Sequence, residues 1–414
     1  MRFLVLGGTG KIGSAVAWDL VRDRDVEAVG IAGRNQGSLD KVRDWIKSDK
    51  LDLHILDTLG RGAAEQLMSQ YDLCINTLPD RRSSYRALEA ATSSGTNALD
   101  VLEEYHRRPE NREAEGLEIP QGMSLEEYGE SLHKRAMDNG VTILDGMGFA
   151  PGLSNVTLAQ GIRTVNAHSA KARVGGIPDQ KSAQRHPLKY IITWSFAHVL
   201  REYSIKVLVR DLGRVAEVDA ISGKENFRFN EFGHDIELEC AVTPGMPSFL
   251  SPFPHLKNFS EKTIRWPGHF DGIDALRECG LLSTEEVNFK GAVFRPRDFL
   301  VATVEPKLKP LPGDRDVCIM WNTAYGELGG DELRSDFYMW SEGDEAHGIS
   351  AMSKVTGFSA ASGARLLGRG DIKEKGIVAP EEAVAGGLYK RCMDDLKERN
   401  IKVFEVTGRA SKLI

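Results

Sequence analysis

The stretch Phe3-Leu4-Val5-Leu6-Gly7-Gly8-Thr9-Gly10-Lys11-Ile12-Gly13 predicts a strand, a tight turn and a helix in succession. A short apolar run leads into Gly8-x-Gly10-x-x-Gly13, and apolar residues then recur at helical spacing. Glycine costs about 1 kcal/mol relative to alanine inside a helix, so glycines gathered at a helix start need a local reason. Close approach of a pyrophosphate to the free backbone N–H groups supplies one, whereas the alternative is a purely structural turn. We predict a dinucleotide site formed by Gly8, Thr9, Gly10, Lys11, Ile12 and Gly13.

The end of the second predicted strand, residues 26–32, favours NADP over NAD. An NAD site usually has an acid there for the ribose 2′-hydroxyl, but this chain has Gly33, Arg34 and Asn35. Two like charges 4 Å apart near a surface repel by about 4 kcal/mol, so a carboxylate would oppose a 2′-phosphate and a guanidinium attracts it. Arg34 could also be an ordinary solvated loop residue, and NAD remains the alternative cofactor.

The strand and helix alternation continues through four more apolar runs, at residues 51–56, 73–79, 98–101 and 141–145. In an open parallel sheet, ligands bind beyond the carboxyl ends of the strands. Asp57 follows the third strand, where it could meet the adenine. Asn76, Thr77, Leu78 and Asp100 end the fourth and fifth strands, which places them on the nicotinamide side. The charged residues 103–121 are interpreted as a solvated loop or flap.

The length of 414 residues exceeds what one core usually holds, so we expect more than one domain. After residue 147 the strand-like runs bunch together with few helices between them, which is typical of an antiparallel α+β domain. The expected fold is α/β: a doubly wound parallel Rossmann domain (1–147), an inserted α+β substrate and dimerisation domain (148–348) and C-terminal helices (349–414) that return to the first domain.

Composition excludes several classes of partner. The net charge of −7 comes from interspersed residues with no basic stripe, which argues against nucleic acid. No apolar run approaches a membrane span, so we expect a cytoplasmic protein with a small-molecule partner. The five cysteines are far apart and include no C-x-x-C pair, so neither a metal site nor a disulfide framework is expected.

Several separated motifs together resemble the saccharopine dehydrogenase superfamily, in the branch of lysine 6-dehydrogenase-like proteins and carboxynorspermidine dehydrogenases. They are the glycine turn, Gly148-Phe149-Ala150-Pro151-Gly152, Gly175-Gly176-Ile177-Pro178, His186-Pro187-Leu188-Lys189-Tyr190, Arg265-Trp266-Pro267-Gly268-His269 and Gly376-Ile377-Val378-Ala379-Pro380. The resemblance implies reversible hydride transfer between a nicotinamide and the carbon–nitrogen bond of an amino acid or a carboxylated amine, and it implies a homodimer. Pro151 is counted with the cofactor site. Ala150 stands where the saccharopine-forming branch has an acid.

Amine chemistry requires a group of adjustable protonation near the nicotinamide. His269 is the first candidate, because it follows a Pro-Gly turn at a strand end and imidazole titrates near neutral pH. Asp100 and Lys189 are the reserves, and a purely structural histidine is the alternative.

An amino-acid substrate also brings a carboxylate, for which Arg265 or Arg173 is the expected partner unless each pairs with a nearby acid. Tyr190 could reach the substrate with its hydroxyl or could simply pack. Gly176 would let the substrate pass close to the backbone.

Two other functions compete with this interpretation. A short-chain-type reductase requires a Tyr-x-x-x-Lys pair, and none of the nine tyrosines has lysine four positions later. A non-catalytic NADP-binding sensor would use the same pocket to regulate a partner, and binding without turnover would reveal it.

Overall fold

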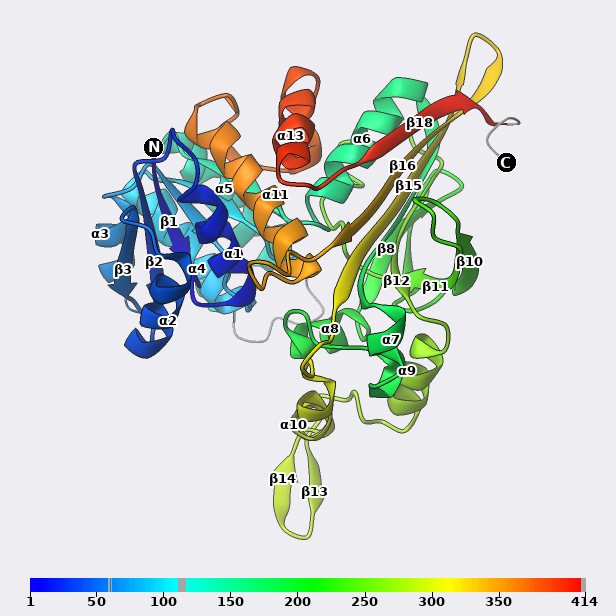
Figure 1. Ribbon diagram of the computed structural model, residues 1–414, viewed down its shortest axis with the longest axis horizontal. Coiled ribbons are helices and arrows are strands. Elements are labelled where there is room, and N and C mark those ends of the chain that lie inside the picture. Colours follow the sequence, from blue (N-terminus) through cyan, green and yellow to red (C-terminus); the bar gives the residue numbers. More distant parts are fainter. Residues whose placement is uncertain (59, 61, 111–116, 411–414) are drawn as a thin grey trace.

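The computed structural model describes the whole chain except residues 59, 61, 111–116 and 411–414, and it builds the described part around two large sheets (Figure 1). The first sheet has strands β1 (Arg2–Leu6), β2 (Ala28–Gly33), β3 (Leu51–Ile55), β4 (Leu73–Asn76), β5 (Asn97–Asp100), β6 (Thr142–Asp145) and β17 (Gly376–Val378). Its helices are α1 (Lys11–Leu20), α2 (Gln36–Ile46), α3 (Ala63–Met68), α4 (Arg81–Ser94) and α5 (Leu125–Asp138).

All strand pairs of the first sheet are parallel, in the order β17-β6-β5-β4-β1-β2-β3. The order reverses at β1, which is the switch point where a doubly wound sheet binds its ligand. The six strands predicted for the first domain are all present. The seventh, β17, was not predicted, and it brings a C-terminal segment back to pair with β6.

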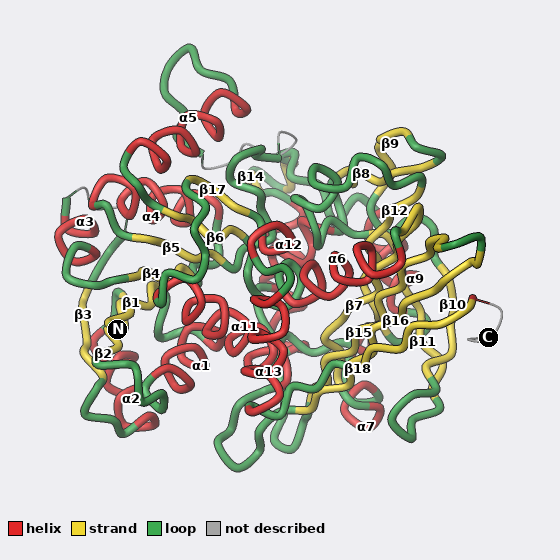
Figure 2. The backbone as a smooth tube through the Cα atoms, turned by 90° about the horizontal axis from the view of Figure 1, so that it is seen from above, coloured by secondary structure: helices red, strands yellow, loops and turns green. Residues whose placement is uncertain are grey.

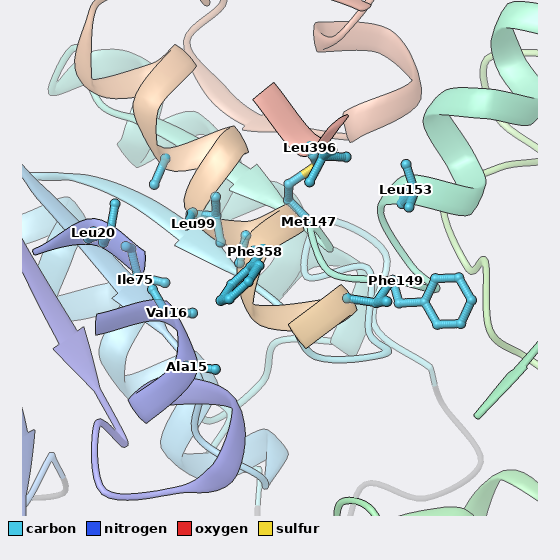
Figure 3. Close-up of a cluster of buried hydrophobic side chains, with 14 of the residues drawn as sticks. Ala15, Val16, Leu20, Ile75, Leu99, Met147, Phe149, Leu153, Phe358 and Leu396 are labelled. Atoms are coloured by element: carbon cyan, nitrogen blue, oxygen red, sulfur yellow. The ribbon is translucent and has the colours of Figure 1, made fainter. Parts of the chain in front are cut away.

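The C-terminal part consists of α11 (Ala351–Gly368), α12 (Pro380–Ala383), α13 (Gly387–Glu398) and β18 (Phe404–Arg409). Helix α11 packs against α1 and crosses the first sheet, and Figure 3 shows Phe358 among the buried side chains there, close to Val16 of α1. Arg365 of α11 is also buried, and its guanidinium pairs with Asp19 and Asp23. Apolar packing and ion pairs therefore both stabilise the contact between α11 and α1.

The second sheet runs in the order β10-β11-β12-β7-β15-β16-β18, with β8 and β9 attached at β12, and Figure 2 shows it beside the first. Its strands are β7 (Ala167–Pro178), β8 (Lys206–Asp211), β9 (Arg214–Asp219), β10 (Glu225–Phe229), β11 (Ile236–Val242), β12 (Asn258–Arg265), β15 (Asp316–Leu328) and β16 (Asp331–Glu342). The other elements are α6 (Leu153–Val165), α7 (Gln180–Ala183), the 3₁₀ helix η1 (Pro187–Lys189), α8 (Phe196–Glu202), α9 (His269–Glu278), β13 (Val287–Phe289), β14 (Ala292–Phe294) and α10 (Pro296–Leu308).

This sheet is mostly antiparallel, and β12 with β7 is its parallel pair in the described part of the chain. The expected α/β fold with a second, largely antiparallel sheet is therefore confirmed. Beyond residue 147 the sequence has strand-like runs at 171–174, 214–221, 236–242, 261–266, 317–321, 337–340 and 401–404. These runs overlap β7, β9, β11, β12, β15, β16 and the first residue of β18, whereas β8 and β10 contain none of them. Among the described residues, none of the helices combines the length and apolarity needed to cross a membrane.

Candidate active site

A cavity of about 590 Å³ lies where the carboxyl ends of the first sheet's strands face the second sheet. Its wall on the first side includes residues that directly follow β1, β3, β4 and β5. Its wall on the other side comes from β7, β12 and the segment around α8, and Met352 and Thr356 of α11 close part of it. The cavity therefore joins the glycine turn to the second sheet.

The glycine turn is built to bring backbone close to a ligand. Gly7 has a φ of +72°, a conformation that favours glycine, and the N–H of Gly10 donates to its carbonyl at 2.9 Å. A Cβ on Gly13 would lie 2.5 Å from the Gly7 carbonyl oxygen, so only glycine lets α1 start this near the turn. Helix α1 has neither a side-chain N-cap nor an acid in its first turn. Its N-terminus faces the cavity as an anion site.

Most of the predicted cofactor residues line this cavity. They are Thr9, Gly10, Lys11, Ile12, Gly13, Gly33, Arg34, Asp57, Thr77 and Leu78. Arg34 is exposed at the rim beyond β2, where a 2′-phosphate would need a positive charge. The residues present therefore fit a phosphorylated dinucleotide.

The other four predicted cofactor residues, Gly8, Asn35, Asn76 and Pro151, are not part of the cavity wall. Gly8 packs against Ile31, and a Cβ there would lie 2.6 Å from the Ile31 Cβ. Asn35 caps α2 by accepting from the N–H of Ser38 at 2.9 Å. Asn76 is buried and accepts from the N–H of Leu78 at 3.3 Å. Pro151 follows Ala150, which is itself a wall residue.

Asp100 belongs to a buried polar network beneath the cavity. Its carboxylate accepts from Asn76 Nδ2 at 2.5 Å, from Ser84 Oγ at 2.7 Å and from the N–H of Leu102 at 2.6 Å. His106 lies 2.7 Å from both Ser84 Oγ and Asp145 Oδ1. Burial alone would lower the pKa of His106, but the negative charges of Asp145 and Asp100 raise it to about 9. With its oxygens engaged, Asp100 holds the strand ends in place and does not face the cavity.

His269 and Lys189, the other catalytic candidates, also lie outside the cavity wall. His269 Nδ1 is 2.9 Å from the Leu188 carbonyl and Nε2 is 3.2 Å from Tyr203 Oη. Burial, helped by the charge of Arg265, lowers the pKa of His269 to about 3, so the imidazole is neutral at physiological pH. Lys189 Nζ donates to the Pro267 carbonyl at 2.5 Å. Neither side chain is placed to exchange a proton with a ligand in the cavity.

Arg265, one of the predicted substrate residues, lies in the cavity wall and brings a positive charge to it. It is 5% exposed, and its guanidinium donates from Nε to Tyr203 Oη and from Nη1 to the Ile264 carbonyl, both at 2.9 Å. Its charge also lies 5.3 Å above the ring of buried Tyr190. These contacts use two of five N–H donors, and they aim a fixed positive charge at the cavity. The ring of Tyr190 therefore packs against the Arg265 guanidinium and helps to fix its position.

The contacts of Arg173 and Gly176 differ from those that their predicted substrate-binding roles require. Arg173 pairs with Glu225 at 2.9 Å and is not part of the cavity wall. This contact matches the alternative interpretation in which the arginine simply pairs with an acid. Gly176 does line the cavity, but a Cβ there would lie 2.2 Å from Cε of Met352. Glycine at this position makes room for α11.

Three glutamates in the wall were missed by sequence reasoning: Glu103, Glu202 and Glu261. Glu202 and Glu261 are 4% and 3% exposed, and burial raises their pKa values to about 7 and about 8. Burial and the nearby Glu202 raise the pKa of Glu103 well above its usual range. The cavity thus holds carboxyl groups that can carry a proton near neutral pH, which the predicted histidine cannot.

These acids come from three separate elements. Glu103 follows β5, Glu202 ends α8 and Glu261 lies in β12 beside Ala172 of β7. The interpretation of residues 103–121 as a solvated loop is wrong at its start, because Glu103 lines the cavity and residues 104–106 are buried. Residues 111–116 lie outside the described part. The one available signal was that Glu103 closely follows the end of a predicted strand.

Comparison with known proteins agrees with this architecture. Residues 3–144 match the family model of the saccharopine dehydrogenase NADP binding domain, which confirms NADP as the predicted cofactor. Residues 148–401 match the saccharopine dehydrogenase C-terminal domain.

Two individual proteins are similar over much of the chain. A saccharopine dehydrogenase [NADP(+), L-glutamate-forming] from Pyricularia oryzae is 23% identical over 338 residues, which cover 65% of this chain and 74% of that protein. The apo structure of saccharopine dehydrogenase (L-Glu forming) from Saccharomyces cerevisiae superposes with a TM-score of 0.76 at 18% identity, covering 98% of this chain and 99% of that one. That likeness shows a shared fold. With the two family models together spanning residues 3–144 and 148–401, the chain belongs to the saccharopine dehydrogenase family and is an NADP-binding oxidoreductase of that family.

Proposed function

We propose that this protein catalyses reversible, NADP-dependent hydride transfer at the carbon–nitrogen bond of an amino acid or a carboxylated amine. The observation that carries the proposal is the cavity that joins the glycine turn to Arg265, to the buried Glu202 and Glu261 and to the partly buried Glu103. NADP, when bound, supplies the hydride acceptor or donor there. We further propose that residues 148–348 act as the substrate domain and that the protein is a cytoplasmic homodimer.

Arg265 is the proposed partner of the substrate carboxylate. A guanidinium offers a planar fork of N–H donors, and here the side chain is fixed by Tyr203 and the Ile264 carbonyl. His269 keeps an indirect role in this arrangement, because its Nε2 contacts the Tyr203 hydroxyl that accepts from Arg265. We therefore propose His269 as a positioning residue for Arg265.

Glu103 and Glu202 are the proposed proton-handling pair. One oxygen of each lies within 4.8 Å of the other, so the two carboxyls cannot both ionise in a buried site without cost. The pair retains a proton near pH 7 and can give it to, or take it from, the reacting nitrogen. Amine oxidation needs a deprotonated carboxyl to accept the proton, and burial raises the pKa of Glu202 to about 7. The rate of oxidation is therefore expected to rise with pH through about 7, and the rate of imine reduction is expected to fall over the same range.

The test compares Glu103→Gln with the parent by NADPH titration and by turnover on a panel of amino acids and carboxylated amines. We expect Glu103→Gln to keep its Kd for NADPH and to lose roughly 100-fold in kcat, the usual size of an acid–base contribution. Glu126→Gln, in an exposed first-turn residue of α5, is the matched control. Tight NADPH binding by the parent without turnover on any member of the panel would contradict the enzyme and favour the sensor.

A further inference from the structure

His106 belongs to a chain of buried hydrogen bonds that the proposed reaction does not use. Its Nδ1 atom is 2.7 Å from Asp145 Oδ1, and its backbone N–H donates to Asp145 Oδ2 at 2.8 Å. On the other side of the ring, Nε2 is 2.7 Å from Ser84 Oγ, and that hydroxyl donates to Asp100 Oδ2 at 2.7 Å. All four side chains are buried, so these contacts must be satisfied within the chain itself.

The number of protons in this chain of bonds follows from the contacts. An ionised Asp145 only accepts, so Nδ1 of His106 must carry a proton. The Ser84 hydroxyl gives its one proton to Asp100, so Nε2 needs a proton of its own to fill its contact with Ser84 Oγ. Asp100 accepts two further bonds from N–H donors, which favour its ionised form. The contacts are therefore complete only when the His106 ring carries both protons.

The groups around the ring favour this charged form. Asp100 ends β5 and Asp145 ends β6, while the ring of Tyr85 from α4 lies with its centroid 4.5 Å from that of His106. Burial lowers the pKa of His106, but the charges of Asp145, Asp100 and the neighbouring Glu104 outweigh it and raise the pKa to about 9. Burial raises the pKa of Tyr85 well above its usual range, so that hydroxyl stays neutral. Helix α5 brings a glycine backbone against the His106 carbonyl.

The segment that carries His106, residues 101–110, also carries Glu103 into the cavity wall. His106 follows Glu103 by three residues, and its two bonds to Asp145 tie the backbone at that point to the end of β6. A backbone that is fixed so close by limits the positions that the Glu103 carboxyl can take.

A second contact ties the far end of this segment to α8. Glu110 Oε2 accepts from Arg201 Nη2 at 3.0 Å, and Arg201 directly precedes Glu202 in that helix. A buried ion pair between the two contacts also holds the segment to α4. The segment thus joins the strand ends of the first sheet to the helix that carries Glu202, the proposed partner of Glu103.

We propose that a doubly protonated His106 is a positioning residue that holds Glu103 in place for proton transfer. His106 is not part of the cavity wall, so it acts through the backbone of residues 101–110. This inference rests on the proposed function, because that function assigns proton transfer to Glu103. When the ring loses its second proton, its contact with Ser84 is no longer filled and the segment loses an anchor.

A metal ion is the alternative occupant of this network. Ligand atoms of Asp100, His106 and Asp145 lie close enough together to hold one. A metal needs a ring nitrogen without a proton, whereas both ring nitrogens of His106 face oxygen atoms that require a donor. Oxygens of Asp100 and Asp145 are likewise engaged by O–H and N–H donors. The arrangement therefore fits a proton better than a metal ion.

The pH profile of kcat for amine oxidation, from about pH 6 to about pH 10, tests this role. The parent should rise through about 7 with Glu202 and fall through about 9 with His106. His106→Gln should lose roughly 10- to 100-fold in kcat, keep its KM and its Kd for NADPH, and lack the fall above pH 9. His255→Gln, at an exposed histidine outside the cavity wall, should match the parent.

Asp145→Asn is the second variant, should His106→Gln fail to fold. Removal of this negative charge lowers the pKa of His106, so the fall in kcat should move to lower pH, which a purely structural contact would not cause. Nitrogen-15 spectra of the histidine rings report protonation without turnover. One of the ten histidines of the parent should keep both ring protons up to about pH 9.

Four results would overturn the role of His106. They are a singly protonated ring at neutral pH, a fall in kcat retained in a folded His106→Gln, an unmoved fall in Asp145→Asn, and stoichiometric Zn²⁺ binding to the parent that His106→Gln removes. No turnover by the parent would refute the proposed reaction, and faster amide exchange confined to residues 101–110 in His106→Gln would still support the positioning of this segment. Turnover with a singly protonated ring refutes the role of His106 alone.

Discussion

Arg34 offers the sharpest test of how the protein selects its cofactor. Its guanidinium is exposed at the cavity rim after β2, so the dielectric of water applies and each unit charge at 4 Å contributes about 1 kcal/mol. A phosphate monoester carries roughly 1.5 to 2 negative charges at neutral pH. Arg34→Gln should therefore weaken NADPH binding by about 1.5 to 2 kcal/mol, a factor of roughly 10 to 30 in Kd. NADH lacks the 2′-phosphate, so its Kd should not change.

Fluorescence titration of both reduced coenzymes against each variant gives the required ratio. Arg34→Lys keeps the charge and should retain most of the preference, and Arg24→Gln is the control at an exposed arginine outside the cavity wall. Raising the salt concentration should shrink the effect, since exposed charges are screened. If Arg34→Gln weakened NADH and NADPH equally, or neither of them, the electrostatic account of cofactor choice would be wrong.

Three further predictions follow from other contacts. Gly13→Ala places a Cβ 2.5 Å from the Gly7 carbonyl oxygen, and the overpacking of about 1–3 kcal/mol should raise the Kd for NADPH roughly tenfold or more; an unchanged Kd would contradict the close-approach argument. Arg365→Met leaves buried Asp19 without one of its ion-pair partners and should lower the free energy of unfolding by about 3–5 kcal/mol in urea titrations, whereas an unchanged midpoint would show that the pairs are not stabilising. Burial raises the pKa of Glu381 to about 7, so the folded protein favours the protonated carboxyl. The contribution of this group to the free energy of unfolding is therefore fully present below the usual pKa of glutamate and is lost as the pH rises through about 7. The unfolding midpoint of Glu381→Gln should accordingly vary less than the parent's between pH 5 and 8, and parallel curves for the two proteins would exclude the effect.

The first sheet could be predicted because its strands other than the edge strand β3 are largely buried on both faces. Such strands are continuous apolar runs, and in this chain each run ends in glycine or polar residues that turn the backbone at the ligand edge. The strand β17 escaped prediction for a physical reason: it has three residues, and its partner β6 lies more than 200 residues earlier. Only the docking of α11 on α1 brings that segment back to the sheet.

The second sheet could be predicted in class but not in detail. Strands β8 and β10 alternate buried and exposed positions and carry charged residues, so neither forms an apolar run. Their place depends on pairing partners: β8 pairs with β9 and touches β12, and β10 pairs with β11. Pairings of this kind are tertiary facts that local pattern does not encode.

The proposed acid–base groups escaped prediction because their properties arise from burial. Taken singly, Glu103, Glu202 and Glu261 are the kind of residue that is usually solvated, and nothing local to any of them indicates a raised pKa. The fold brings the end of β5, the end of α8 and the middle of β12 to one cavity, and the loss of water there raises all three pKa values. The same loss of water moves His269 the other way, since burial favours the neutral form of an imidazole. A sequence-based choice between histidine and carboxylate at this site therefore depends on knowing which side chains are buried, because burial favours the neutral form of His269 and the protonated form of the glutamates.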